Sequence, residues 1–294
     1  MDNKVEIIEV GPRDGFQSVA CAHIPLQEKL ELIGDLVSAG VRHMEFTSFV
    51  SPKAIPQLAD AGEITKAVLE TYPDLDMFAL VPNLRGAKNA YESGLQKVCY
   101  VVSLSASHNQ ANINRTHEQS LASFREIKDT YPDMEIIVDL ATAFGCPSEG
   151  KYRNPYRVKE FLKDYVEAGM KTCCLCDTIG IADPAQVKGL IAVLQEAYPD
   201  LGLMVHFHDT RGSGLANSLA AIEAGVVRLQ SALGGLGGCP FAPGASGNLS
   251  TEDLVWEEMG YETGICFHEL LKTAKKQAGM IQGNYSGHQI HIRD

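Results

Sequence analysis

Two histidines, His206 and His208, stand one residue apart in the apolar segment 203–209, which reads LMVHFHD. Alternate residues of a β-strand project to the same face, so a strand here would present both imidazoles side by side. Neutral imidazoles presented in this way can bind one divalent metal ion. Taken alone, the pair is equally consistent with two strand histidines that are satisfied by hydrogen bonds. The rest of the chain must therefore distinguish a metal site from this alternative.

A second polar pair follows the first apolar run of the chain. Residues 5–10 read VEIIEV and lead directly into 11–17, which read GPRDGFQ and contain Arg13 and Asp14. A cation and a carboxylate side by side at the end of a strand suit oxyanion chemistry at a metal. The alternative is a surface turn with an incidental ion pair.

Length and composition indicate an ordinary globular enzyme. The chain has 294 residues, 45% of them hydrophobic and 21% charged, and a formal net charge of -12. This length accommodates a barrel of about 250 residues. The negative charge disfavours nucleic-acid binding, which requires a clustered basic surface. The start of the sequence lacks the apolar run of a signal peptide, and no stretch approaches the roughly 18 apolar residues that span a bilayer, so we expect a cytoplasmic protein without membrane association.

The eight cysteines are spread along the chain, unlike the dense framework of a small disulfide-stapled fold. We expect reduced thiols. Residues 173–176 read CCLC and contain a C-x-x-C spacing, but they lie in an apolar run and no second such pair completes a zinc site. These cysteines are therefore interpreted as small buried fillers.

Apolar runs alternate regularly with amphipathic segments, and no low-complexity linker divides them. The expected strands are 5–10, 41–47, 76–82, 97–104, 134–141, 171–177, 203–208 and 227–233. The expected helices are 25–39, 57–71, 84–93, 117–130, 155–168, 184–198, 213–224 and 251–259. Eight such units predict an α/β fold of the (β/α)₈ TIM-barrel type. An open doubly wound sheet is the alternative, but no G-x-G-x-x-G follows the first strand.

The barrel is expected to end near residue 264. We therefore divide the chain into a catalytic barrel, 1–264, and a short C-terminal extension, 265–294, packed on the barrel. A helical pattern covers 267–277, and 283–294 resembles a loose tail. His288 and His291 lie in that tail and receive little weight as site residues.

Active sites of such barrels gather at the carboxyl ends of the strands. Polar residues that could take part in catalysis or binding follow the predicted strands at that end. They are Arg13, Asp14, Glu45, Thr47, Ser48, Asn83, Ser103, Ser105, Ser107, Asp177, Thr178, His206 and His208. A folding requirement alone would not concentrate polar groups at one rim.

Asp14, His206, His208 and Asn248 together offer a carboxylate, two imidazoles and an amide oxygen. This set suits magnesium, manganese or a similar ion, whereas zinc more often recruits thiolates. Water or substrate oxygens would fill the remaining coordination positions. Asn248 taken alone fits a loop cap equally well.

The segment 234–247 contains six glycines and two prolines in fourteen residues. It suits either a mobile cover or a tight connection. Cys239 lies inside it, and a thiol beside a metal can donate or accept a proton because its pKa responds to local charge. The alternative is an inert cysteine in a turn.

Several motifs, in order, are similar to those of the hydroxymethylglutaryl-CoA lyase family, in the metal-dependent TIM-barrel lyase and synthase superfamily. They cover nearly the whole chain. They are 11–17 (GPRDGFQ), 47–53 (TSFVSPK), 145–147 (GCP), 177–180 (DTIG), 206–210 (HFHDT), 235–240 (GLGGCP) and 244–249 (GASGNL).

The resemblance implies an oxo-acid-lyase (EC 4.1.3 class) that cleaves 3-hydroxy-3-methylglutaryl-CoA to acetyl-CoA and acetoacetate by retro-Claisen cleavage. It implies Mg²⁺ or Mn²⁺ on Asp14, His206, His208 and Asn248. Arg13 would stabilise the enolate oxygen. Glu45 and Asp177 would orient substrate or water, and Cys239 would join proton transfer. The base is left open between Asp14, His206 and water.

The resemblance further implies an acyl-CoA substrate and a homodimer. No organic cofactor is expected. The residues expected to contact the substrate are Arg13, Gln17, Ser48, Asn83, Ser105, Ser107 and Thr178.

Two segments depart from the family pattern. Residues 18–20 read SVA where such lyases usually continue Asn-Glu, and 108–110 read HNQ where a glutamate commonly follows the second serine. Cleavage of a related 3-hydroxy acid or its thioester is therefore an alternative. A Claisen-type synthase of the same superfamily is another, although its first motif usually differs. A catalytically silent metal-binding barrel is the third.

Overall fold

Eight parallel strands close into a barrel in the order β1-β10-β9-β8-β5-β4-β3-β2. The computed structural model describes residues 4–21, 23–238, 247–256 and 260–292. The strands are β1 (Glu6–Glu9), β2 (His43–Ser48), β3 (Asp76–Val81), β4 (Lys97–Ser103), β5 (Glu135–Ala141), β8 (Thr172–Asp177), β9 (Gly202–Phe207) and β10 (Arg228–Ser231). The predicted (β/α)₈ barrel is confirmed, and each expected strand range overlaps one observed strand.

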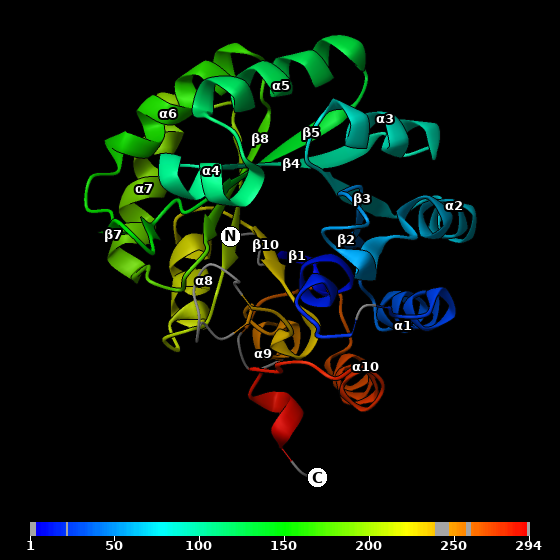
Figure 1. The fold of residues 1–294 in the computed structure, drawn as a ribbon. Helices are drawn as coiled ribbons and strands as arrows, with labels where there is room; N and C mark the ends of the chain where they lie inside the picture. Colours follow the sequence, from blue (N-terminus) through cyan, green and yellow to red (C-terminus); the bar gives the residue numbers. More distant parts are fainter. Residues whose placement is uncertain (1–3, 22, 239–246, 257–259, 293–294) are drawn as a thin grey trace.

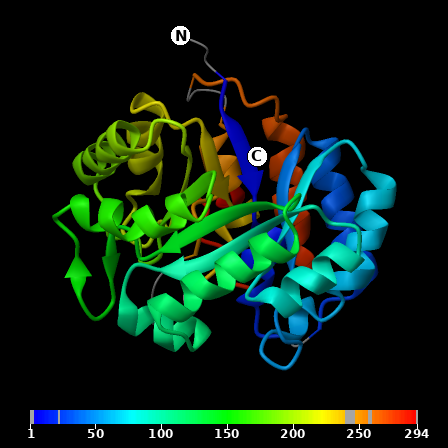
Figure 2. The same ribbon diagram turned by 90° about the horizontal axis from the view of Figure 1, so that it is seen from above.

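Helices surround the barrel, as the views along and across it show (Figures 1 and 2). They are α1 (Leu26–Ser38), α2 (Ala61–Thr71), α3 (Leu84–Glu92), α4 (Ala106–Ile113), α5 (His117–Thr130), α6 (Tyr156–Glu167), α7 (Pro184–Ala197), α8 (Gly214–Glu223), α9 (Thr251–Leu254) and α10 (Phe267–Met280). A large apolar core fills the layer between strands and helices. Burial of this layer holds the two rings of elements together.

Side chains that alternate along the strands also fill the barrel interior. Ile8, Phe78, Ile137 and Met204 belong to a second buried apolar cluster that also contains Cys99, Cys174 and Cys176. All seven cysteines in the described part of the chain are unpaired. The thiols of 173–176 are buried, as their interpretation as small fillers requires.

The sequence prediction was wrong about the last helix of the barrel. The expected helix 251–259 is observed as α9, which ends at Leu254, and residues 257–259 lie outside the described residues. Val255 caps α9 outside the helical conformation, with φ of -94° and ψ of 4°, and Trp256 is not helical either. The longer helix α10 instead packs beside α1 (Figure 1), where Lys276 Nζ lies 2.7 Å from Glu31 Oε1.

Three short features, a turn, a helix and a hairpin, were not expected from the sequence. The segment Gly11–Gly15 forms a π-helical turn, η1, rather than an irregular loop. Helix α4 follows β4, and β6 (Gly145–Cys146) pairs with β7 (Gly150–Lys151) in a hairpin after β5. Each of them is too short for its periodicity to be read from the sequence. All three lie at the carboxyl ends of barrel strands.

Residues 283–292, the described part of the expected loose tail 283–294, are packed on the barrel instead. Tyr285 forms an antiparallel bridge with Leu236, and Ile290 is buried with 9% of its surface exposed. His288 donates its backbone N–H to Asp253 Oδ2 at 2.7 Å. Sequence periodicity missed this packing because it is made by single residues rather than by an amphipathic helix. Within the described residues, no helix is long and apolar enough to cross a membrane.

Candidate active site and metal centre

Asp14, His206 and His208 converge at the carboxyl rim of the barrel. One ligand atom from each lies within 4.8 Å of the other two. His206 belongs to β9, His208 follows its end, and η1 carries Asp14 across from them after β1. Asn248 joins them, because it forms a backbone bridge with His208 and donates its amide Nδ2–H to Asp14 Oδ2 at 2.8 Å.

The ligand set fits a divalent cation. Among the described residues, neither His208 Nδ1 nor Asn248 Oδ1 has a hydrogen-bond partner, although both atoms are buried. A buried polar atom without a partner is costly, and a bound cation would satisfy both. One carboxylate, two imidazoles and one amide oxygen suit magnesium or manganese.

The charge states of these side chains also suit metal binding. Burial opposes ionisation of Asp14, but the charges of Arg13, His206 and His208 lower the pKa of this carboxyl to about 2. Burial lowers the pKa of His206 to about 4, and it lowers the pKa of His208 as well. At neutral pH the site therefore presents an ionised carboxylate and two neutral imidazoles, the forms that bind metal ions.

Gln230, a residue that sequence reasoning missed, orients His206. Its Oε1 lies 3.0 Å from His206 Nδ1, so the imidazole donates from Nδ1 and keeps Nε2 as an acceptor. Such partners behind a metal-binding histidine fix its tautomer and ring orientation. The signal in the sequence was an amide side chain inside the short strand β10, opposite Ile8 on the neighbouring strand.

Arg13 links the metal-binding group to β2. Its Nη1 lies 2.5 Å from Asp14 Oδ1, and its Nη2 lies 2.6 Å from Glu45 Oε2. Gln17 Nε2 donates to the same Asp14 oxygen at 2.6 Å. Burial opposes the charge of Arg13, but Glu45 and Asp14 raise its pKa above the ordinary value. Arg13 is therefore a fixed cation with only 6% of its surface exposed.

A second polar group lies deeper in the barrel. Glu45, Cys99 and Asp139 have ligand atoms within 4.8 Å of one another, and so do Asp139, Cys174 and Cys176. Sequence reasoning missed Asp139, although a carboxylate inside the apolar strand 135–141 was a readable signal. Burial raises the pKa of Asp139, and burial together with Asp139 raises the pKa of Glu45 against the opposing effect of Arg13. Burial also raises the pKa of the Cys99 and Cys174 thiols well above the ordinary value. The hydrogen bond with Cys174 lowers the pKa of Cys176, but burial raises it overall, so all three thiols keep their protons at neutral pH.

Several expected site residues shape the rim through contacts within the protein. The two carboxyl oxygens of Asp177 accept backbone N–H groups of Ile181 and Ala182, each at 2.9 Å, and burial raises its pKa to about 6. Asn83 accepts the N–H of Gly86 at 3.0 Å at the start of α3. Direct catalytic or substrate contacts by Asp177 and Asn83 stay predictions.

Thr178 and Ser48 differ in their surroundings. Thr178 Oγ1 accepts the backbone N–H of Thr142 at 2.8 Å. Thr142 has a φ of 57°, an uncommon conformation for a β-branched residue, and its hydroxyl in turn accepts the N–H of Ser105 at 3.1 Å. Ser48 Oγ is buried without a hydrogen-bond partner among the described residues, and its proposed contact with substrate stays a prediction.

Ser105 and Ser107 belong to a polar cluster over the hairpin. Ser105 Oγ donates to Glu149 Oε1 at 2.5 Å and lies 3.0 Å from Ser107 Oγ. Cys146 Sγ lies 3.2 Å from Ser105 Oγ. These residues are outside the group of Asp14, His206 and His208. Cys239 lies outside the described residues.

The two segments that depart from the family pattern have structural contacts. In the second, Ser103 Oγ lies 2.7 Å from His108 Nδ1, and the buried Asn109 accepts the backbone N–H of Ser103 at 2.9 Å. In the first, Ser18 Oγ donates to the carbonyl of Gly15 at 2.7 Å. These residues therefore stabilise α4 and the end of η1.

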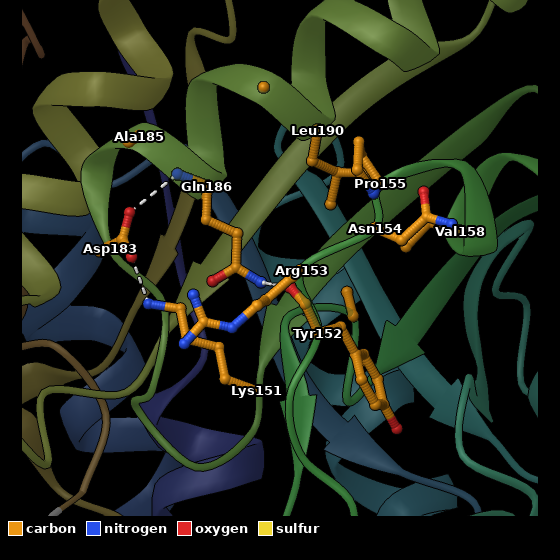
Figure 3. A pocket seen from close by; sticks show the side chains of 12 residues that line it. Lys151, Tyr152, Arg153, Asn154, Pro155, Val158, Asp183, Ala185, Gln186 and Leu190 are labelled. Atoms are coloured by element: carbon orange, nitrogen blue, oxygen red, sulfur yellow. Dashed lines mark hydrogen bonds and ion pairs between the residues drawn. The ribbon is translucent and has the colours of Figure 1, made fainter.

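A pocket of about 280 Å³ lies apart from the metal-binding group (Figure 3). It is bordered by the hairpin and by the first turns of α6 and α7. Gln186 lies beside it and donates to the carbonyl oxygens of Phe144 and Tyr152 at 2.8 and 2.6 Å. Lys151 is ion-paired with Asp183 at the pocket's edge. None of the expected site residues lines this pocket.

Comparisons with known proteins agree with the geometry. The model of the HMGL-like family matches residues 4–276. The hydroxymethylglutaryl-CoA lyase of Bacillus subtilis is 39% identical over 278 residues, covering 92% of this chain and 91% of that protein. The human mitochondrial hydroxymethylglutaryl-CoA lyase is 39% identical over 276 residues, covering 92% and 84%. The structure of an HMG-CoA lyase from Acinetobacter baumannii in complex with coenzyme A and 3-methylmalate matches with a TM-score of 0.90 and 39% identity, covering 99% of this chain and 98% of that one.

Proposed function

This chain belongs to the HMGL-like family, and we propose that it cleaves 3-hydroxy-3-methylglutaryl-CoA into acetyl-CoA and acetoacetate. The observation that carries the proposal is the convergence of Asp14, His206 and His208 within 4.8 Å, with Arg13 in contact with Asp14. This combination supports a cation site beside a buried guanidinium. A cleavage that generates an enolate needs a cation to polarise the substrate oxygens and a positive group to stabilise the enolate oxygen.

Asp14, His206, His208 and Asn248 would hold Mg²⁺ or Mn²⁺. The ion, when bound, would polarise oxygen atoms of the substrate. Gln230 would keep Nε2 of His206 directed to the site through its contact with Nδ1. Gln17 and Arg13 both bind Asp14 Oδ1 and so fix the carboxylate plane.

The reaction redistributes one electron pair and one proton. The C3 hydroxyl loses its proton as the bond between C2 and C3 breaks, and C3 becomes the ketone carbon of acetoacetate. The electron pair of that bond passes to the acetyl thioester as an enolate. Protonation of the enolate carbon then gives acetyl-CoA, so the atoms of the substrate appear in two products without any further reactant.

Arg13 would bind the oxygen on which the enolate charge develops. Its guanidinium has five N–H donors, and the ion pairs with Asp14 and Glu45 engage only two of its nitrogens. Both carboxylates hold the side chain in place before substrate arrives. Preorganised donors of this kind stabilise a transition state because little reorganisation is needed during the reaction.

The proton acceptor is Asp14, His206 or a water molecule. The pKa of Asp14 is lowered to about 2 and that of His206 to about 4, so each protein group is a weak base in the metal-free protein. We further propose that Cys239 supplies or accepts the second proton.

The substrate alternative follows from segments 18–20 and 108–110. Asn109 and Ser18 make contacts within the protein, and these contacts hold the segments that follow β4 and η1. A 3-hydroxyacyl thioester with a different substituent at C3 would use the same metal-binding group and the same bond cleavage. Turnover rates across a panel of such thioesters distinguish this alternative substrate from 3-hydroxy-3-methylglutaryl-CoA.

We propose a cytoplasmic homodimer. The unpaired state of the seven described cysteines is typical of a reducing compartment. The dimer rests on family resemblance, and light scattering on the purified protein tests it.

The test is a product balance. Purified protein, incubated with Mn²⁺ or Mg²⁺ and 3-hydroxy-3-methylglutaryl-CoA, should release acetyl-CoA and acetoacetate in equal amounts, and a chelator should stop the release. Cleavage of another thioester in the panel at a much higher kcat/KM would reassign the substrate. No turnover of any thioester by folded, metal-loaded protein would refute the lyase activity.

A further inference from the structure

Residues 285–288, close to the C-terminus, contact the segment 234–236 that follows β10. We call residues 285–288 the tail clamp. Tyr285 pairs with Leu236 in an antiparallel bridge, and the N–H of Gly287 donates to the carbonyl of Gly234 at 3.0 Å. Ser286 Oγ donates to the carbonyl of Gly235 at 3.1 Å. The tail clamp thus lies along 234–236 and joins it through one isolated β-bridge and two further hydrogen bonds.

The tail clamp also reaches the main chain of Asn248. Ser286 Oγ lies 3.4 Å from the carbonyl oxygen of Asn248, and the Asn248 amide donates to the carbonyl of Leu236 at 3.0 Å. The backbone of Asn248 bridges to His208. Asn248 is therefore enclosed by the end of β9, the segment 234–236 and the tail clamp.

Buried carboxylates in α9 anchor this arrangement. Asp253 Oδ2 accepts the N–H of His288 at 2.7 Å and lies 2.9 Å from its Nδ1, while Asp253 Oδ1 accepts the N–H of Gln289 at 2.8 Å. Glu252 Oε2 accepts the N–H of Gly234 at 2.9 Å. Two neighbouring carboxylates thereby hold the tail clamp and the segment 234–236 in place relative to each other.

The close approach leaves no room for a side chain at residue 287. A Cβ atom there would lie 2.8 Å from Ser250 Oγ and 2.9 Å from Ser250 Cβ. A Cβ at Gly235 would lie 2.7 Å from Ser286 Oγ. Glycine at both positions is what allows the tail to lie directly against the segments that position Asn248.

We propose that the tail clamp is a positioning element of the metal site, in which Ser286 and Gly287 fix the main chain of Asn248. The inference rests on the proposed function, because Asn248 is a proposed metal ligand there. Its side chain can direct Oδ1 to the cation only while its backbone keeps its place between His208 and the tail clamp. The tail clamp touches no substrate and acts through Asn248.

Mn²⁺ binding to the metal-free protein tests this role. Ser286→Ala removes the hydroxyl contacts, and Gly287→Ala inserts a methyl group between the tail clamp and Ser250. Isothermal calorimetry should show about 10-fold weaker Mn²⁺ binding in either variant, the range found for partners behind a ligand. Asn284→Ala, an exposed change in the same tail, and Gly279→Ala, where a Cβ would meet nothing within 4 Å, serve as controls.

Turnover separates positioning from general destabilisation. At saturating Mn²⁺ the two variants should recover the parent KM for substrate and most of kcat, and thermal unfolding without metal should follow the controls. If Gly287→Ala does not fold, Ser286→Ala decides. Parent-like Mn²⁺ affinity in folded Ser286→Ala and Gly287→Ala overturns the inference, whereas failure of the parent itself to bind Mn²⁺ overturns the proposed metal site.

Discussion

Two groups of metal-binding residue types occupy successive depths of the same barrel. The rim group is Asp14, His206 and His208, and the inner group is Glu45, Cys99, Asp139, Cys174 and Cys176. Strand register relates the two groups: Cys176 pairs with His206 and Cys174 pairs with Met204, so the inner group begins at the level of His206 and extends two residues deeper. Both groups contain buried acceptor atoms without a hydrogen-bond partner among the described residues, but the rim group has a low carboxyl pKa, whereas the inner group has raised carboxyl and thiol pKa values.

The difference arises from what each carboxylate touches. Asp14 receives hydrogen bonds from Arg13, Gln17 and Asn248, which stabilise its charge. Asp139 has Glu45, Cys99 and Cys174 as neighbours instead, and burial raises its pKa more than Cys99 and the more distant charge of Arg13 lower it. Donor type alone therefore does not define a metal site. Burial with compensating donors favours a charged ligand, and burial without them favours a retained proton.

The largest expected effect follows from removing a rim ligand. His208→Ala should weaken Mn²⁺ binding by more than about 100-fold, beyond the loss typical for an outer partner, and should lower turnover by orders of magnitude. The barrel should remain folded because the rim is separate from the packed core. Calorimetry and circular dichroism measure the two effects, with the exposed His268→Ala as the control. Unchanged metal affinity would remove His208 from the ligand set.

Arg13→Lys tests the guanidinium between the two groups. A point ammonium cannot contact Asp14, Glu45 and an enolate oxygen at once, so we expect kcat to fall by about 100-fold with a smaller change in KM. Steady-state kinetics at saturating metal measure the change. A kcat close to that of the parent would make Arg13 a structural residue.

Two cysteine substitutions compare a thiol proposed to transfer a proton with a thiol that packs inside the barrel. Cys239→Ser should bind metal and substrate normally and turn over slowly, because serine lacks an accessible anion near neutral pH. Iodoacetamide should inactivate the parent more slowly when substrate is bound. Cys174→Ser, the inner comparison, should keep kcat. Full activity of Cys239→Ser would exclude its role in proton transfer.

The smallest expected effect is on pH-dependent stability. Because burial raises the pKa of Asp139 above its unfolded value, the folded protein binds this proton more tightly. Its contribution to stability is complete at low pH and is lost as pH rises through the folded pKa. Asp139→Asn should therefore lessen the decline in unfolding free energy above pH 4, relative to the exposed Asp133→Asn.

Urea unfolding between pH 4 and pH 8 measures this difference. A steeper decline for Asp139→Asn than for the parent would mean that Asp139 is charged in the folded protein. In that case the inner group would resemble the rim group.

Periodicity was enough to predict the barrel and the position of the rim group. Alternation along 203–208 placed His206 and His208 on one face, and the apolar run before Arg13 placed Asp14 at the same end. Such patterns extend over several residues and therefore survive in the sequence. The family motifs added Asn248, which spacing alone left open between a ligand and a loop cap.

The rest of the site depended on contacts between distant single residues. Gln230 supports a histidine on a neighbouring strand, and Asp139 meets Glu45 across the barrel interior. The packed tail depends on Ser286 and His288 meeting backbone groups far from them in the chain. No periodicity encodes such pairs, so they became visible only in three dimensions.

Metal stoichiometry tests the contrast between the two groups most directly. Metal-free protein titrated with Mn²⁺ and followed by electron paramagnetic resonance should bind one ion per chain. Cys174→Ser should retain that ion with the parent affinity, and His208→Ala should lose it. An ion that persists in His208→Ala and disappears in Cys174→Ser would place the metal in the inner group and contradict the account.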